Sequence, residues 1–146
     1  SHQVISISYN NAEYDLPVNY LRRQCSDFMK LGMAGTTVVV SSGDYGSAWR
    51  QFSTSPPNSY YNYDNTCVGE FATTFVPTML SSCPYVTSVG ATQVTQGSNF
   101  TVQEVAAFQE IDVNLTFSSG GGFSNIFTTP DYQASAVNGY FATAGA

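Results

Sequence analysis

One stretch of the chain, VVVSSGDYG at residues 38–46, constrains the fold more than any other. Its consecutive valines are typical of a parallel strand covered on both faces, because such strands lose the alternation of polar and apolar side chains. The strand gives way to small residues, a single carboxylate and two glycines. In open α/β sheets the ligand crevice lies at the carboxyl ends of the strands, where Asp44 is expected. Asp44 is therefore a candidate for chemistry, and a structural turn or cap is the alternative.

The flanking segments predict a parallel sheet with crossover helices. Residues 4–9 form a strand-like run, and residues 20–33 carry apolar side chains at helical spacing before the valine strand. This order predicts a strand–helix–strand unit. Residues 85–94 indicate a further sheet strand, and residues 102–117 an exposed antiparallel pair. A final helix is expected from Pro130, with Tyr132, Ala136, Val137, Tyr140 and Phe141 on one face.

Composition limits the classes of partner. The 146 residues carry a formal net charge of −6, and only 10% of them are charged. Nucleic acids and anionic membranes need basic surface, so neither is expected as a partner. The length predicts a single domain over residues 1–146. An acidic chain of this kind suits an environment of low pH, where its carboxylates lose charge.

Cysteines and sequons point to an oxidising, extracellular setting. Cys67 and Cys83 flank a loop rich in Pro, Asn and Tyr, which favours a disulfide between them. Cys25 falls on the apolar face of the predicted helix and is expected to be a buried free thiol. Asn99 and Asn114 begin glycosylation sequons. We expect a secreted protein, although no leader is visible before Ser1 and no stretch is long enough to span a membrane.

Taken together, three motifs resemble the sedolisin family of serine-carboxyl peptidases, which includes tripeptidyl peptidases. They are SSGDYG at residues 41–46, CPYVTSVGAT at 83–92 and SSGGGFSN at 118–125. The segments YLRRQC (20–25) and FMKLG (28–32) are most similar to fungal members. The resemblance covers nearly the whole chain, and it implies a subtilisin-like α/β fold in which a parallel sheet is flanked by helices, here as a partial domain.

The resemblance implies specific roles for several residues. Asp44 matches the aspartate of the oxyanion hole, which can donate a hydrogen bond only while protonated, so activity is expected at acid pH. Ser8, Tyr9 and Asn10, with Ser42 and Gly43, match the segments that bind the peptide substrate. Asn10 stands where the family usually has Gly. Glu13 follows this strand, as in relatives, and is not expected to be the catalytic base.

The resemblance also implies that other catalytic groups lie outside the sequence. The family places its base Glu and the orienting Asp upstream of Ser1, and its nucleophile and calcium-binding aspartates downstream of the Gly-rich turn. No cofactor or metal is therefore expected in this chain, and the chain alone is expected to be inactive. We expect it to associate with the remaining segments of the peptidase or with further copies of itself. The alternative is a non-catalytic, sedolisin-derived binding or bioactive protein.

Overall fold

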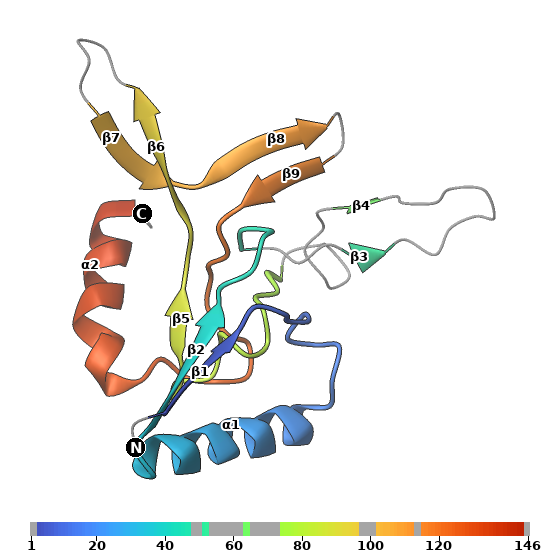
Figure 1. The fold of residues 1–146 in the computed structure, drawn as a ribbon, viewed down its shortest axis with the longest axis vertical. Helices are drawn as coiled ribbons and strands as arrows, with labels where there is room; N and C mark the ends of the chain where they lie inside the picture. Colours follow the sequence, from blue (N-terminus) through green and yellow to red (C-terminus); the bar gives the residue numbers. More distant parts are fainter. Residues whose placement is uncertain are drawn as a thin grey trace, which may run out of the picture.

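A computed structural model describes residues 3–47, 51–52, 63–64, 74–96, 102–112 and 115–144 of the chain (Figure 1). The strands are β1 (Gln3–Ile7), β2 (Thr36–Ser41), β3 (Gln51–Phe52), β4 (Tyr63–Asp64), β5 (Thr87–Val89), β6 (Thr92–Gln96), β7 (Val102–Ala106), β8 (Phe108–Asp112) and β9 (Leu115–Ser118). The helices are α1 (Val18–Met33) and α2 (Ala134–Ala144), and a 3-10 helix (Asp131–Gln133) leads into α2.

The valine strand is the centre of a parallel sheet, as predicted. β2 lies between β1 and β5, and both neighbours run parallel to it. Val38 pairs with Ile5 and Val40 with Ile7, so these side chains point to the same face of the sheet. α1 connects β1 to β2, which confirms the strand–helix–strand unit. The fold is therefore α/β, with its parallel strands ending together at one edge.

The core lies between this sheet and α1. Leu21 of α1 is buried against Val38 and Val40, together with Met79 and Leu80 from the segment that precedes β5. The opposite face of the sheet has no such cover from the described residues. Val4 and Val89 point to that face, since they alternate with the core positions, and both are exposed.

Two predictions for the second half of the chain need correction. The single strand expected at residues 85–94 is two strands, because the chain leaves the parallel sheet at Gly90 and Ala91. Beyond that break β6 pairs with β7 in a separate antiparallel ribbon. Only β8 and β9 form the antiparallel pair expected within residues 102–117. Figure 1 shows both ribbons extending beyond the end of the sheet at which its strands terminate. The final helix is confirmed, with α2 following the 3-10 helix.

The predicted Cys67–Cys83 disulfide is wrong. Cys83 is bonded to Cys25, with a Cα–Cα distance of 5.5 Å, so Cys25 is not a free thiol either. The physical reason is that α1 turns Cys25 inward, toward the turn that precedes β5, and both cysteines are buried. A separation of 58 residues leaves no local signal of this pairing. Cys67 lies outside the described residues.

The Cys25–Cys83 bond is expected to stabilise the packing of α1. Replacing both residues by Ala should lower the free energy of unfolding by about 2–5 kcal/mol, because the closed loop is long. Urea unfolding of the purified protein measures this change, and Cys67→Ala is the matched control. A non-reducing peptide map that joins Cys83 to Cys67 would contradict the assignment.

Candidate active site

Asp44 lies on a tight turn directly after β2, at the edge where the parallel strands end. Its side chain is exposed, and glycines with positive φ stand on either side, Gly43 at 101° and Gly46 at 64°. The turn is anchored at its start, because Ser42 N–H donates to Val89 O at 2.9 Å and Thr78 Oγ1 donates to Ser42 O at 2.8 Å. The carboxyl group of Asp44 is therefore presented to solvent from a fixed backbone.

The Gly-rich segment packs directly against this turn through backbone hydrogen bonds. Gly120 N–H donates to Gly43 O at 2.8 Å, and Gly121 N–H donates to Gly46 O at 3.0 Å. Ser118 N–H donates to the backbone oxygen of Asp44 at 2.8 Å. The close approach requires glycine, since a Cβ on Gly120 would lie 1.9 Å from Ser42 O. The sequence motifs SSGDYG and SSGGGFSN thus form one structural unit.

The residues after β1 reach the same edge. The β1–β2 register ends with Ile7 paired to Val40, and Ser8, Tyr9 and Asn10 come directly after it. The Tyr9 side chain is 85% exposed. Asn10 instead faces inward: its Oδ1 accepts hydrogen bonds from Asn11 N–H at 3.0 Å and from Leu80 N–H at 3.1 Å. Its Nδ2 is buried and has no hydrogen-bond partner among the described residues. The side chain of Asn10 therefore connects the end of β1 to the backbone of Leu80.

Glu13 is buried beside this edge, with 1% of its surface exposed. Its Oε1 accepts a hydrogen bond from Ser124 Oγ, and its Oε2 accepts from Asn125 N–H at 2.7 Å and from Asn125 Nδ2 at 3.2 Å. Sequence reasoning noted Glu13 but missed these partners, which lie more than 100 positions away. Their only sequence signal is that Ser124 and Asn125 end the SSGGGFSN motif.

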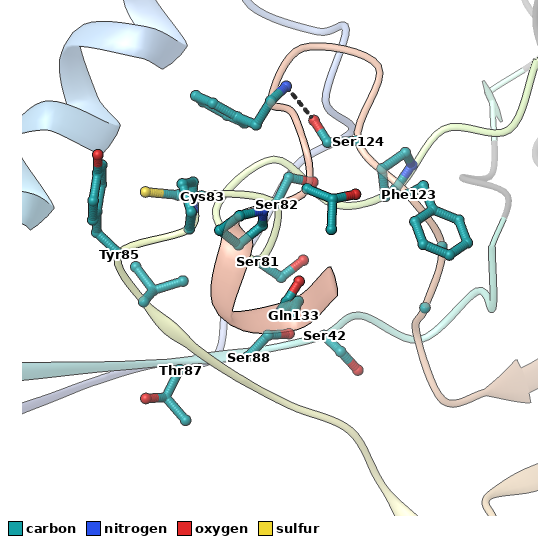
Figure 2. Close-up of a pocket in the computed structure, with 18 of the residues that line it drawn as sticks. Ser42, Ser81, Ser82, Cys83, Tyr85, Thr87, Ser88, Phe123, Ser124 and Gln133 are labelled. Atoms are coloured by element: carbon teal, nitrogen blue, oxygen red, sulfur yellow. Dashed lines mark hydrogen bonds between the residues drawn. The ribbon is translucent and has the colours of Figure 1, made fainter. Parts of the chain in front are cut away.

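Two cavities adjoin the Asp44 turn. The first holds about 700 Å³ and is rich in hydroxyl groups (Figure 2). Its lining includes the following polar side chains: Ser42, Ser81, Ser82, Thr87, Ser88, Thr128, Thr129, Tyr132 and Gln133. The second holds about 760 Å³ and is lined by Phe75, Phe123, Tyr140 and Phe141, with Ser47 and Asn125 among its polar residues. Residues 122–124 line both cavities.

The cationic side chains of the described residues are gathered on one helix. The three described Lys and Arg residues, Arg22, Arg23 and Lys30, are all on α1. Asp27 and Lys30 are both exposed on α1. The hydrogen bond that Lys30 donates and the positive charge of Lys30 hold the pKa of Asp27 below its ordinary value. This pair is the one salt bridge among the described residues. Glu13 is therefore stabilised by neutral donors.

The described part of the chain contains no cluster of three His, Cys, Asp or Glu side chains that could hold a metal ion. None of its helices has the length and apolar character needed to cross a bilayer. The sequon residues Asn99 and Asn114 lie outside the described ranges.

The Gly-rich contact gives a direct test of this geometry. Gly120→Ala should lower the free energy of unfolding by about 1–3 kcal/mol or more, because its methyl group would overlap the Ser42 carbonyl oxygen. Gly121→Ala is the matched control, since no atom would lie within 4 Å of its Cβ. Chemical unfolding of the two variants checks the difference. Equal stabilities would mean that the two turns do not pack as described.

Comparisons with known proteins agree with the motifs. The chain is 46% identical over 138 residues to aorsin of Aspergillus oryzae, and 42% identical over 142 residues to tripeptidyl-peptidase sed1 of Aspergillus fumigatus. These alignments cover 94% and 97% of this chain and 20% of each relative. A solved structure of Pseudomonas sedolisin, a serine-carboxyl proteinase complexed with two molecules of pseudo-iodotyrostatin, matches with a TM-score of 0.66 at 26% identity. No family model matches the chain.

The chain belongs to the sedolisin family. Its relatives are fungal peptidases, and its fold matches the sedolisin structure over 94% of this chain and 34% of that protein. The chain spans about a fifth of the length of the curated relatives it matches. In fold it is a partial α/β domain of the sedolisin kind.

Proposed function

We propose that this chain is a section of the catalytic domain of a secreted, acid-acting serine-carboxyl peptidase, either an endopeptidase or a tripeptidyl peptidase. The observation that carries the proposal is the Asp44 turn. An exposed carboxyl group stands at the end of the central parallel strand, and backbone hydrogen bonds to the Gly-rich segment hold the turn in place. A fixed hydrogen-bond donor at such a position is what oxyanion stabilisation requires, because no reorganisation is then needed during the reaction.

Asp44 is proposed as the donor to the oxyanion that forms when a peptide carbonyl is attacked. A carboxyl group can donate only while it carries its proton, so this role confines activity to acid. The exposed Asp44 side chain is free to meet a substrate. The turn before it needs glycine, because Gly43 has a φ of 101° and a Cβ there would lie 2.6 Å from Thr78 Cγ2.

The substrate would lie along the segment that follows β1. Ser8 and Tyr9 are exposed and directly follow β1, whose last residue pairs with Val40 of β2; Ser42 and Gly43 follow β2 at the same edge of the sheet. A peptide added as a further strand gains main-chain hydrogen bonds there, and its alternate side chains enter pockets. Asn10 would act through its backbone, since its side chain is directed inward to Leu80 N–H.

The remaining catalytic groups are proposed to come from other segments of a longer protein. The base Glu, the Asp that orients it and the Ser nucleophile would complete the site around Asp44. Two surfaces support such a partner. The face of the sheet opposite α1 exposes Val4 and Val89, and Phe123, Tyr140 and Phe141 form a half-exposed aromatic cluster. Secretion, and glycosylation at Asn99 and Asn114, belong to the same proposal.

The role of Asp44 is tested in the longer peptidase. Asp44→Ala should lower kcat by about 10²–10³-fold, because one oxyanion donor is lost. Asp44→Asn keeps a donor that needs no proton, so it should retain more activity than Asp44→Ala and extend it toward neutral pH. Steady-state kinetics of the three forms across the acid range measures both effects. Full activity of Asp44→Ala would remove this residue from the mechanism.

The exposed apolar surfaces predict association of the isolated 146-residue chain. Because these surfaces lack cover from the described residues, the chain should form dimers or larger species under native conditions. Light scattering combined with native mass spectrometry measures the assembly, and Tyr140→Ser with Phe141→Ser should weaken it. A stable monomer of 15.7 kDa would contradict the expected need for a partner.

A further inference from the structure

The buried carboxylate of Glu13 has a hydrogen-bond environment that selects its chemical form. Every polar group described around it is a donor: Ser124 Oγ–H, Asn125 N–H and Asn125 Nδ2–H. The hydroxyl oxygen of Ser124 already accepts from Ile126 N–H at 3.0 Å and from Phe127 N–H at 2.9 Å. Its two lone pairs are therefore occupied, and its single hydrogen is committed to Glu13.

This arrangement excludes the neutral isostere. A glutamine at position 13 has one acceptor oxygen and one donor amide group. If its amide faced Ser124, it would meet an oxygen whose lone pairs are already used. If its amide faced Asn125, it would oppose two N–H donors. Either orientation leaves buried donors without acceptors, which is costly in a site that is almost fully buried.

The partners of Glu13 connect it to the Asp44 turn. The backbone N–H of Glu13 donates to Pro77 O at 2.9 Å, while its carboxylate binds Ser124 and Asn125. Asn125 Nδ2 also donates to Phe75 O at 2.8 Å, so Glu13 and Asn125 together connect the segment after β1 to residues 75–77 and 124–125. Residues 124–125 end the Gly-rich segment SSGGGFSN, in which the amides of Gly120 and Gly121 donate to the backbone oxygens of Gly43 and Gly46, on either side of Asp44. Displacement of residues 124–125 would thus move the support of that turn.

We propose that Glu13 is a positioning residue that acts in its carboxylate form, holding the Gly-rich segment and through it the Asp44 turn in the geometry that the peptidase site needs. The catalytic part of this role of Glu13 rests on the proposed function. The hydrogen bonds from Ser124 and Asn125 to Glu13 do not depend on that function. Glu13 does not touch the substrate in this proposal, since it is buried on the inner side of residues 124–125.

The kinetic test uses the longer peptidase with Glu13→Gln, Asp44→Ala and the double variant. Glu13→Gln should lower kcat by roughly 10- to 100-fold, the scale expected for a misplacement of about 1 Å at a catalytic group, with a smaller change in KM. In the Asp44→Ala background the same substitution should have little further effect on kcat, because the group that it positions is gone. Glu104→Gln, on an exposed carboxylate of β7, is the matched control and should behave as wild type.

A second readout does not depend on peptidase activity. Amide hydrogen exchange at Gly120 and Gly121 should be about tenfold faster or more in Glu13→Gln than in Glu104→Gln, because the segment loses its anchor. If Glu13→Gln does not fold, Asn125→Ala removes only one donor and should show smaller changes in the same direction.

Each outcome bears on one proposal. Wild-type kinetics and exchange in Glu13→Gln, or equal losses in both backgrounds, would overturn the positioning role and leave the proposed function intact. Full activity of Asp44→Ala would overturn the proposed role of Asp44 and, with it, the catalytic part of this inference. The exchange rates would then decide whether Glu13 holds the Gly-rich segment at all.

Discussion

The contact between the turn after β2 and the Gly-rich segment is the constraint on which the rest of the site depends. The two backbones approach so closely that Gly120 has no room for a Cβ. Ser118 makes two backbone hydrogen bonds to this turn: its N–H donates to Asp44 O at 2.8 Å, and its carbonyl oxygen accepts from Gly46 N–H at 3.1 Å. The two segments are joined by bonds between backbone atoms, which form only when the two chains lie very close together. Small residues are therefore needed on both segments. The same contact brings the second half of the chain to the carboxyl edge of the parallel sheet.

The sequence was sufficient where the physical signal is local. Three consecutive valines predict a strand of a parallel sheet, and the apolar spacing of Leu21, Cys25 and Phe28 predicts a helix that covers it. The burial on both faces that the valines also implied is found only on the α1 face, among the described residues. Both elements form as predicted, and β2 is central in the sheet. The position of Asp44 after β2 follows from the same argument, because a ligand edge is defined once the strand direction is known.

The sequence was insufficient where the deciding contact is distant. The chain breaks between β5 and β6 because Ala91 N–H donates to Ser119 Oγ at 2.8 Å, and a Cβ on Gly90 would lie 2.8 Å from that oxygen. Alternation of side chains over residues 85–94 carries no information about Ser119. The Cys25–Cys83 bond and the Glu13–Ser124 hydrogen bond have the same character, since each joins segments whose proximity exists only after the sheet has formed.

Glu13 shows why such a distant contact can require a charged group without a charged partner. An ionised carboxylate accepts hydrogen bonds on both oxygens, whereas every neutral side chain of its size has at least one hydrogen to donate or lacks the second acceptor. Ser124 and Asn125 offer only donors toward this position, and a bond to a charged group is stronger than one between neutral groups. A cationic side chain at this site would supply an opposite charge, but it would compete with Ser124 for Oε1 of Glu13. The neutral donors of Ser124 and Asn125 instead hold residues 124–125 in one orientation. In that orientation the preceding glycines can contact the turn that carries Asp44.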